Sequence, residues 1–351
     1  MNFNIKILDD KDSLWQEIYS LKNYSIYHTK EWKSLVEESF NHTAYYLSAL
    51  SDGRLLDVLP FFLIKKTGLG AKLISTPYES CHGAFLSMDK DVHRNLIERA
   101  IDYGKNTKVK YVEIRSKNPV DILKEYNFEE FSPFITTEIS LKTVDQNWNS
   151  LSAKHRRNVR NAQKKGVRVK SASNISDMET FYKILRHHYK SIGVPFFNNK
   201  FFCKIWQKLI ENDRGSLLIT EFENKIIGGH LLLHSGDTLI SKYSAHRTDG
   251  KYKSVYASYA SNWSAIEFGI QNNYKQFNMG ITGSSNVGLI HFKSSFGGEN
   301  NPVFFYYFAI NGRVPNLAKY YDEYSSIKKI WSFLPTFFTT FLGQKINEWI
   351  I

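Results

Sequence analysis

The sequence predicts an α/β protein made by tandem duplication of one unit of strands and helices. The pentapeptide Ala100–Gly104 (AIDYG) recurs as Ala265–Gly269 (AIEFG), 165 residues later. At the same offset, the strand-like stretch Lys110–Ile114 recurs as Lys275–Met279, and a hairpin pattern precedes each copy. Two matches in the same order indicate duplication rather than chance.

The first copy reads as a hairpin, a helix and further strands. Alternating apolar residues flank the polar turn Ser51–Gly53, which is typical of two antiparallel strands. A helical pattern ending at Gly104 then leads into an alternating stretch. The expected elements are strands at Ala44–Leu50 and Leu55–Ile64, a helix at Leu96–Gly104, and strands at Lys110–Ile114 and Thr136–Leu141.

The second copy repeats this order after two additional helices. Its hairpin turn is Glu223–Lys225, again between alternating apolar stretches. The expected elements are helices at residues 177–191 and 200–212, strands at Leu217–Phe222, Ile226–His234 and Thr238–His246, and a helix from Val255. The polar stretch Lys142–Ser150 marks a boundary, so we expect domains at 1–145 and 146–315 and a helical tail at 316–351.

Composition limits the function classes. Hydrophobic residues make up 42% of the 351 residues, enough for two buried cores, which excludes a disordered chain. The formal charge of +12 favours a partner that carries phosphates. Two distant cysteines, Cys81 and Cys203, give no disulfide framework or zinc pattern. No secretory signal is recognised at the N-terminus, so we expect a cytoplasmic protein, with the inner face of the membrane as a further site.

A basic segment opens the second copy. Between Asp145 and Asp177 there are eight lysines and arginines and no acidic residue. On a helix, Leu151, Val159, Ala162 and Gly166 share one side, whereas the cations gather on the other. These cations are Arg156, Arg157, Arg160 and Lys164. This arrangement predicts a phosphate-binding face. A solvated charged face is the alternative.

A second candidate lies between the strand ending at His246 and the following helix. A helix N-terminus offers backbone N–H groups and the positive end of a dipole, which favour phosphate. The residues that would hold a phosphate there are Arg247, Gly250, Lys251, Lys253 and Ser254. The alternative is an ordinary turn that Ser254 caps.

A third candidate is the stretch Gly288–Gly298, whose alternation predicts a strand with Lys293 on the face of His291 and Ser295. A lysine flanked by aromatic residues such as Phe292 would stabilise the oxyanion formed when an amine attacks a carbonyl. The alternative is a lysine that faces solvent on a half-buried sheet. The deprotonating base would be His246, Tyr243 or His230, among which strand placement does not choose.

Several catalytic motifs are missing from the sequence. We find no nucleophile elbow, Walker A loop, dinucleotide-binding fingerprint or paired metal-ligand motif. The pairs His187–His188 and His230 with His234 lack carboxylate companions, so we interpret them as structural and expect no metal. Of the possible mechanisms, this leaves direct transfer of a group between two bound substrates, promoted by positioning and electrostatics.

Together, four motifs resemble the Fem-type peptidoglycan-bridge aminoacyltransferases and related GNAT-like acyltransferases. They are the basic helix from Leu151, the Gly228–Gly229 strand, the Tyr274–Gly280 strand and the segment Gly288–Gly297. The loop Ser75–Gly83 is similar to one in relatives from polysaccharide gene clusters, and the turn at Gly250 resembles a GNAT pyrophosphate loop. The resemblance covers about residues 1–310, motif by motif.

The resemblance implies two GNAT-like domains in tandem, each a mixed, mostly antiparallel sheet flanked by helices. It further implies acyl transfer to an amine or hydroxyl in a ternary complex, with Lys293 beside the reacting carbonyl and Arg156, Arg157 and Arg160 on the family's basic helix. The acceptor would be a small-molecule or lipid-linked sugar or peptide, a cell-envelope or surface-polysaccharide precursor.

Three departures concern the donor and the acceptor. Val36 stands four residues after Trp32 where bridge enzymes tend to carry lysine, Asn278 stands at a typical aspartate, and a long helical arm for tRNA is missing. We therefore expect acyl-CoA as the donor, with aminoacyl-tRNA and a peptidoglycan precursor as the alternative pair. A non-enzymatic nucleic-acid-binding protein is the second alternative.

The tail carries aromatic residues edged by lysines between Lys328 and Ile351. Such a segment would rest on an anionic membrane at its surface. The alternative is a helix packed back on the core.

Overall fold

The computed structural model describes residues 3–21, 23–78 and 83–314, together with Trp331, Leu334, Gly343 and Ile346. They form two compact units. The first unit comprises the chain up to Ile135 and the segment from Pro302, and the second comprises Thr136–Asn301 with the part of the tail that includes Trp331. The predicted tail at 316–351 lies almost entirely outside the described residues.

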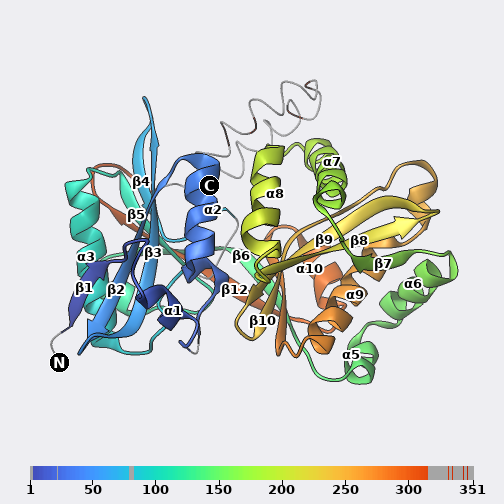
Figure 1. Ribbon diagram of the computed structural model, residues 1–351, viewed down its shortest axis with the longest axis horizontal. Helices are drawn as coiled ribbons and strands as arrows, with labels where there is room; N and C mark the ends of the chain where they lie inside the picture. Colours follow the sequence, from blue (N-terminus) through green and yellow to red (C-terminus); the bar gives the residue numbers. More distant parts are fainter. Residues whose placement is uncertain are drawn as a thin grey trace. The chain divides into compact units, whose positions relative to one another are not determined.

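The first unit is a sheet with the order β1-β2-β3-β4-β5-β12 (Figure 1). All neighbouring strands are antiparallel except β4 and β5, which are parallel and joined by α3. Its elements are β1 (Asn4–Ile7), α1 (Leu14–Ile18), η1 (Ile26–His28), α2 (Lys30–Phe40), β2 (Thr43–Ser51), β3 (Arg54–Lys66), β4 (Gly70–Ile74), α3 (Lys90–Asn106), β5 (Tyr111–Ser116) and α4 (Ile122–Glu125). Strand β6 (Glu129–Ser140) begins in this unit, and β12 (Glu299–Ala309) ends in it.

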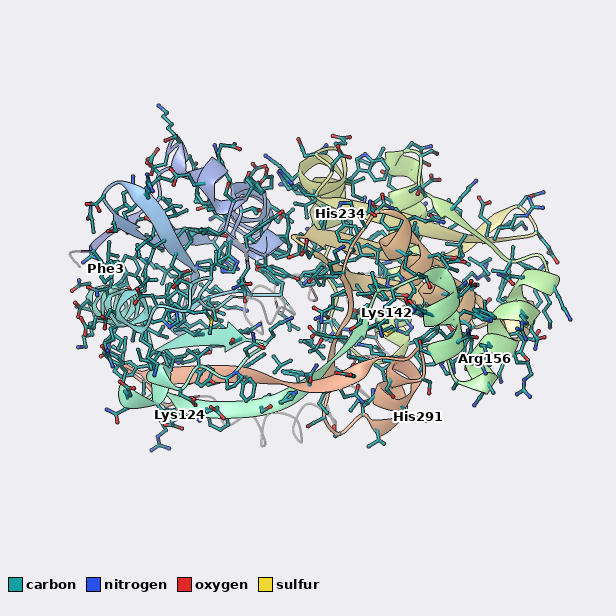
Figure 2. The ribbon with its side chains drawn as sticks, turned by 90° about the horizontal axis from the view of Figure 1, so that it is seen from below. Phe3, Lys124, Lys142, Arg156, His234 and His291 are labelled. Atoms are coloured by element: carbon teal, nitrogen blue, oxygen red, sulfur yellow. The ribbon has the colours of Figure 1, made fainter. Side chains whose placement is uncertain are left out.

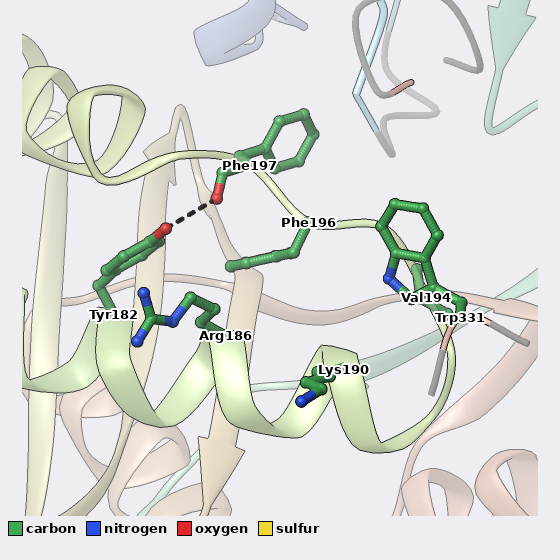
Figure 3. Close-up of a pocket in the computed structure, with 7 residues that line it drawn as sticks. All are labelled: Tyr182, Arg186, Lys190, Val194, Phe196, Phe197 and Trp331. Atoms are coloured by element: carbon green, nitrogen blue, oxygen red, sulfur yellow. Dashed lines mark hydrogen bonds between the residues drawn. The ribbon is translucent and has the colours of Figure 1, made fainter. Parts of the chain in front are cut away.

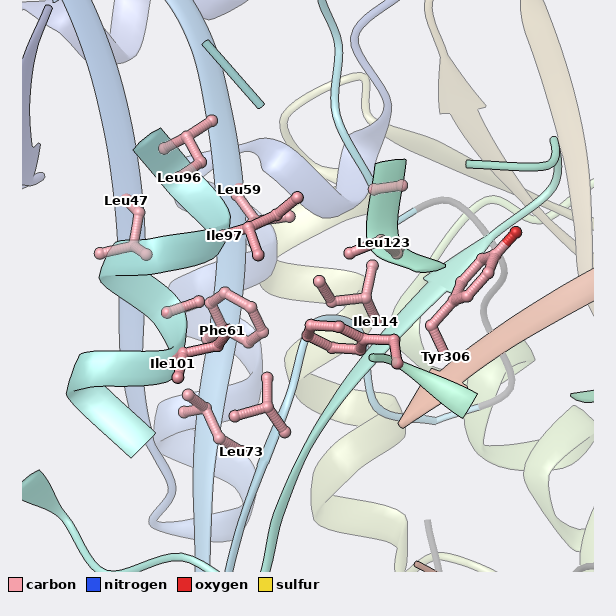
Figure 4. Close-up of a cluster of buried hydrophobic side chains, with 14 of the residues drawn as sticks. Leu47, Leu59, Phe61, Leu73, Leu96, Ile97, Ile101, Ile114, Leu123 and Tyr306 are labelled. Carbon is pink, nitrogen blue, oxygen red and sulfur yellow. The ribbon is translucent and has the colours of Figure 1, made fainter. Parts of the chain in front are cut away.

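Local chemistry explains the hairpin and the long helix of this unit. Asp52 and Gly53 both have positive φ, as the tightest hairpin turns require. Asp89 caps the start of helix α3, because its side chain accepts hydrogen bonds from the backbone N–H groups of Asp91 and Val92. Its apolar stripe packs on the strands to form the core in Figure 4, which contains Leu47, Leu59, Phe61, Leu73, Leu96, Ile97, Ile101, Ile114, Leu123 and Tyr306.

The second unit repeats this plan, with the strand order β6-β11-β10-β9-β8-β7. Strands β7 to β10 pair antiparallel, β10 and β11 are parallel, and α9 joins that last pair. The elements are α5 (Val144–Ser150), α6 (Ala153–Lys164), β7 (Arg168–Ser171), α7 (Ile175–Ser191), α8 (Asn199–Ile205), η2 (Trp206–Ile210), β8 (Gly215–Phe222), β9 (Lys225–Ser235), β10 (Thr238–His246), η3 (Gly250–Ser254), α9 (Ala257–Gln271), β11 (Gln276–Gly283) and α10 (Val287–Ser294).

The duplication is thereby confirmed as a repeated succession of three antiparallel strands, a helix and a parallel strand. The repeated pentapeptides end at equivalent glycines, Gly104 and Gly269. A Cβ at Gly104 would lie 2.5 Å from Ile310 Cδ1, and one at Gly269 would lie 2.6 Å from Leu141 Cδ1. Each copy therefore uses glycine where the crossover helix meets a neighbouring apolar side chain closely.

Two expectations differ from the structure. The predicted strand at Gly288–Gly298 is wrong, because the chain forms helix α10 there, with the Asn286 side chain accepting a hydrogen bond from Leu289 N at its start. The division between the units falls within β6, between Ile135 and Thr136, instead of within Lys142–Ser150, which forms α5. Within the described residues, no helix is long and apolar enough to span a membrane.

Candidate functional site

In the second unit, the parallel strands β10 and β11 pair along only part of their length. Their register ends at Ile240 and Asn278, although both strands continue. Gly280 has φ +74°, and a Cβ there would lie 2.9 Å from the carbonyl oxygen of Ser241. Glycine is thus required where the two strands begin to separate.

A β-bulge on β10 sets which side chains face this point. The register with β9 shifts between Ser241 and Tyr243. Beyond the shift, the Tyr243 ring packs against Phe196, Phe197 and Phe202, at centroid distances of 5.8, 6.4 and 5.4 Å. These rings belong to the α7 and α8 side of the sheet (Figure 1).

His230 and His246 lie on the opposite face, toward α9. A Cβ at Gly229 would meet Phe181 of α7, whereas one at the adjacent Gly228 would meet His246. Successive strand residues point to opposite faces, so His230 shares the face of Gly228. Tyr243 is therefore separated by the sheet from the two histidines with which the sequence grouped it.

Both histidines are neutral at neutral pH. Burial, with a smaller contribution from the charge of Lys293, lowers the pKa of His230 to about 4. Burial likewise lowers the pKa of His246 to about 3. Their Nε2 atoms lie 2.6 Å from Ser241 Oγ and 3.2 Å from Thr220 Oγ1. A neutral imidazole of such low pKa accepts a proton poorly, which weakens both residues as general bases.

Lys293 reaches this region from helix α10. Its half-buried side chain donates hydrogen bonds from Nζ to the carbonyl oxygens of Gly280, at 3.0 Å, and Ile281, at 3.4 Å. The ammonium thus sits at the end of β11 that no longer pairs with β10. The Phe292 ring lies in an aromatic cluster with His155, Tyr259 and Phe296.

A polar network beneath Gly280 was not found by sequence reasoning. Asn278 Oδ1 accepts hydrogen bonds from Gly280 N, at 2.8 Å, and from Thr136 Oγ1, at 3.0 Å. Its Nδ2 donates to Glu138 Oε1 at 2.9 Å, and Gln276 Nε2 donates to the other oxygen of Glu138, also at 2.9 Å. An aspartate at 278 would face Glu138 with like charge, so asparagine suits this carboxylate.

The cations of the predicted phosphate turn are largely neutralised within the protein. Arg247 forms a two-pronged ion pair with Asp249 and stacks on Tyr252, with Cζ 4.2 Å from the ring centroid. Lys251 pairs with Glu223. Ser254 does not cap α9, which begins at Ala257, and Lys253 is exposed. Gly250 has φ +50° and an open Cβ position.

The basic helix α6, on which Figure 2 labels Arg156, keeps most of its charge uncompensated. Across the described part of the chain, no carboxylate pairs with Lys154, Arg157, Arg160 or Lys164, which are all exposed. Arg160 lies over Trp148, with its Cζ 5.2 Å from the ring centroid. Arg156 differs from the prediction, because its half-buried guanidinium donates to the backbone carbonyls of Asn149 and Leu151. In the predicted apolar stripe, Leu151, Val159 and Ala162 are buried, whereas Gly166 is exposed. Leu151 and Gly166 lie outside α6.

Helix α6 adjoins the turn before α9. Lys165 Nζ donates to the carbonyl oxygen of Ser254 at 2.9 Å and lies 5.6 Å from the ring centroid of Tyr256. The basic helix and the start of α9 therefore form one continuous surface. A small pocket lies elsewhere in the unit, where Arg186 and Lys190 of α7 meet Tyr182, Phe196, Phe197 and Trp331 (Figure 3).

Comparison with known proteins identifies the family. The model of the FemAB family matches residues 124–212 and 210–302, about half of the chain. The chain belongs to the FemAB family. A search of curated protein sequences found no match.

Solved structures agree on the fold of this FemAB-family protein. The crystal structure of FemX is 14% identical, covers 93% of this chain and all of its own, and gives a TM-score of 0.72. L-PGS from Bacillus licheniformis is 11% identical over 93% of this chain and 98% of its own, with a TM-score of 0.57. A tandem GNAT protein of the clavulanic acid pathway is 9% identical over 90% of this chain and all of its own, with a TM-score of 0.52.

Family and fold together make this FemAB-family protein an acyl- or aminoacyltransferase of tandem GNAT-like architecture. The alternative of a non-enzymatic nucleic-acid-binding protein is therefore set aside.

Proposed function

We propose that the protein transfers an aminoacyl group from tRNA to an amine of a cell-envelope precursor, at the separated ends of β10 and β11. The observation that carries the choice of donor is the contrast between two basic regions. Arg247 and Lys251 in the turn before α9 are paired with carboxylates, whereas Lys154, Arg157, Arg160 and Lys164 on α6 are not.

Exposed arginines and lysines without carboxylate partners suit an extended polyphosphate. Binding of a polynucleotide releases counterions for each phosphate neutralised, and a row of cations on one helix gains from this repeatedly. Like charges at i, i+4, such as Arg160 and Lys164, repel by a few tenths of a kcal/mol, which phosphate binding would offset. The phosphates of CoA, by contrast, would need the turn in which Arg247 and Lys251 are already paired with carboxylates.

The chemistry proposed for Lys293 is stabilisation of negative charge. The acceptor amine attacks the ester carbonyl carbon of the donor, and the carbonyl oxygen becomes an oxyanion. The ammonium of Lys293 stabilises this oxyanion. The carbon–oxygen bond to the ribose then breaks, the ribose oxygen takes up a proton, and the amine loses one. The low pKa values of His230 and His246 favour a proton route that does not use either imidazole as base.

The acceptor class follows from the family resemblance. FemAB-type proteins imply a peptidoglycan precursor, and a structural relative from Agrobacterium fabrum is named a putative lysylphosphatidylglycerol synthetase. We propose a soluble or lipid-linked envelope precursor that presents an amine. The predicted contact of the tail with anionic lipid stays a prediction.

An acyl-CoA donor is the second candidate, and Gly250 favours it. No heavy atom lies within 4 Å of its Cβ position, so the backbone of the turn is open to a pyrophosphate. The tandem GNAT protein of the clavulanic acid pathway, whose structure was solved without AcCoA, is a structural relative from a class that points to the same donor.

Binding and turnover with each donor test the proposal. The triple variant Arg157→Ala, Arg160→Ala, Lys164→Ala should weaken tRNA binding, and the slope of log K against log salt should fall by roughly 2 to 3. The matched control, Arg99→Ala, Lys105→Ala, Lys108→Ala, removes three exposed cations from α3 and the turn after it, and should leave the slope unchanged.

Purified protein is then incubated with aminoacyl-tRNA or with acetyl-CoA and an amine acceptor. Aminoacyl transfer that the α6 variant impairs supports the proposal. Release of CoA thiol with no aminoacyl transfer would overturn it in favour of the second candidate.

A further inference from the structure

His155 joins helix α6 to the end of helix α10. The side chain is buried, and both ring nitrogens have partners. Nδ1 lies 2.9 Å from Ser152 Oγ, at the start of α6, and Nε2 lies 3.1 Å from the carbonyl oxygen of Phe292. Phe292 directly precedes Lys293, so the ring contacts the residue next to the proposed oxyanion-stabilising group.

The partners of His155 define its tautomer. A carbonyl oxygen only accepts hydrogen bonds, so Nε2 carries the proton and donates to Phe292. Nδ1 then accepts from the Ser152 hydroxyl. Burial lowers the pKa of His155, which keeps the ring in this neutral form.

Further contacts join the same two helices. Ser152 N donates to the carbonyl oxygen of Ser295 at 2.9 Å. The His155 ring lies 5.3 Å, between centroids, from the ring of Phe292 and 4.6 Å from that of Phe296, just after α10. It also lies 4.9 Å from the ring of Tyr259 in α9. Helix α10 has no buried residue of its own, so its position depends on such contacts at its C-terminal end.

We propose that His155 is a positioning residue that fixes Lys293 relative to the basic helix. This inference rests on the proposed function, in which α6 binds the donor and Lys293 stabilises the oxyanion. A donor held through its phosphates on α6 meets the ammonium in a fixed geometry only if α10 keeps its place. Small displacements of a positioned group cause large losses of rate.

The protein contains a matched control for this histidine. His28 in the first unit is also buried, with Nδ1 2.7 Å from Ser25 Oγ, three residues earlier, and Nε2 2.9 Å from the carbonyl oxygen of Ala84. The hydrogen-bond pattern of His155 is thus repeated in the first unit, to which neither α6 nor α10 belongs.

The experiment compares His155→Phe, His155→Gln and His28→Phe in the full chain. His155→Phe keeps a ring and loses the donor, so kcat should fall about tenfold or more while the Kd for tRNA stays unchanged. Glutamine can donate from its amide, so His155→Gln should recover part of kcat. His28→Phe should leave kcat per folded molecule unchanged.

Hydrogen exchange separates this inference from the proposed function, since it needs no donor. In His155→Phe, amides of residues 287–296 should exchange about tenfold faster, and in His28→Phe they should not. Unchanged exchange and unchanged kcat in His155→Phe would overturn the positioning role, as would weakened tRNA binding with normal kcat. If the unmodified protein does not transfer an aminoacyl group but His155→Phe still shows faster exchange, the result contradicts only the choice of donor and leaves the positioning role intact.

Discussion

The Lys293 ammonium donates a 3.0 Å hydrogen bond to the backbone carbonyl oxygen of Gly280. This contact connects helix α10 to β11 at the point where β11 leaves its parallel partner β10. A cation at the separated ends of two strands, held by carbonyl oxygens, can exchange one of these weak partners for a developing oxyanion.

Lys293→Ala is expected to lower kcat roughly 100-fold, because one stabilising donor to the oxyanion is lost. Single-turnover transfer measures this directly. The exposed neighbour His291→Ala serves as the matched control and should retain normal turnover. Equal rates for Lys293→Ala and the unmodified protein would remove the lysine from the mechanism.

Gly280→Ala is expected to destabilise the protein by about 1–3 kcal/mol, because a non-glycine residue at φ +74° is strained and its Cβ would approach Ser241 O. Urea unfolding measures the change. Gly288→Ala in α10, with no heavy atom within 4 Å of its Cβ position, should be neutral or gain about 0.5–1 kcal/mol. A similar loss in both variants would contradict this account.

Asn278→Asp is expected to destabilise the protein by about 1–3 kcal/mol at pH 7, since a carboxylate would replace the amide that donates to Glu138. Two adjacent carboxylates raise the pKa of the pair in the folded state, so the defect should shrink as the pH falls. Denaturant unfolding at pH 7 and pH 5 measures both effects.

The double variant Asn278→Asp, Glu138→Gln restores one donor and one acceptor to this pair. Its stability should recover most of the loss caused by Asn278→Asp alone. If the double variant instead loses the sum of the losses in Asn278→Asp and in Glu138→Gln, the amide and the carboxylate do not interact.

Local signals predicted the hairpins and the basic helix well. Positive φ at Asp52 and Gly53, and at Glu223 and Asn224, matches the turns expected from polar residues between alternating stretches. Buried Val159 and Ala162 match the helical period, whereas Leu151 is buried just before α6 begins. These features depend on residues near one another in the sequence.

The errors have longer-range causes. The short stretch Gly288–Gly298 fits a strand or a helix, and the hydrogen bond that Asn286 accepts from Leu289 N favours the start of helix α10. The bulge on β10 reverses the face of Tyr243 relative to Ser241, which a strict period of two does not reveal. The same alternation does place Tyr243 and His246, three residues apart, on opposite faces. The partners that matter are distant in the chain: Glu223 neutralises Lys251, and Glu138 binds Asn278. His155 was hidden among the basic residues, although Ser152 three residues earlier was a usable signal.

Buried histidines should make the stability fall in mild acid. Burial lowers the pKa of His28 from 6.5 to about 4, so between these values the unfolded chain binds a proton that the folded protein does not. The contribution of neutral His28 to the free energy of unfolding is therefore complete above pH 6.5 and is lost as the pH falls toward 4. The loss amounts to about 3 kcal/mol. Burial lowers the pKa of His42 to about 4 as well, which adds to the same trend.

Urea unfolding between pH 7 and 4.5 measures the slope of the free energy of unfolding against pH. The variant His28→Gln cannot titrate at this position, so it should reduce that slope by up to one proton. A free energy of unfolding that stays flat over this range, or an unchanged slope in His28→Gln, would mean that His28 titrates normally in the folded protein.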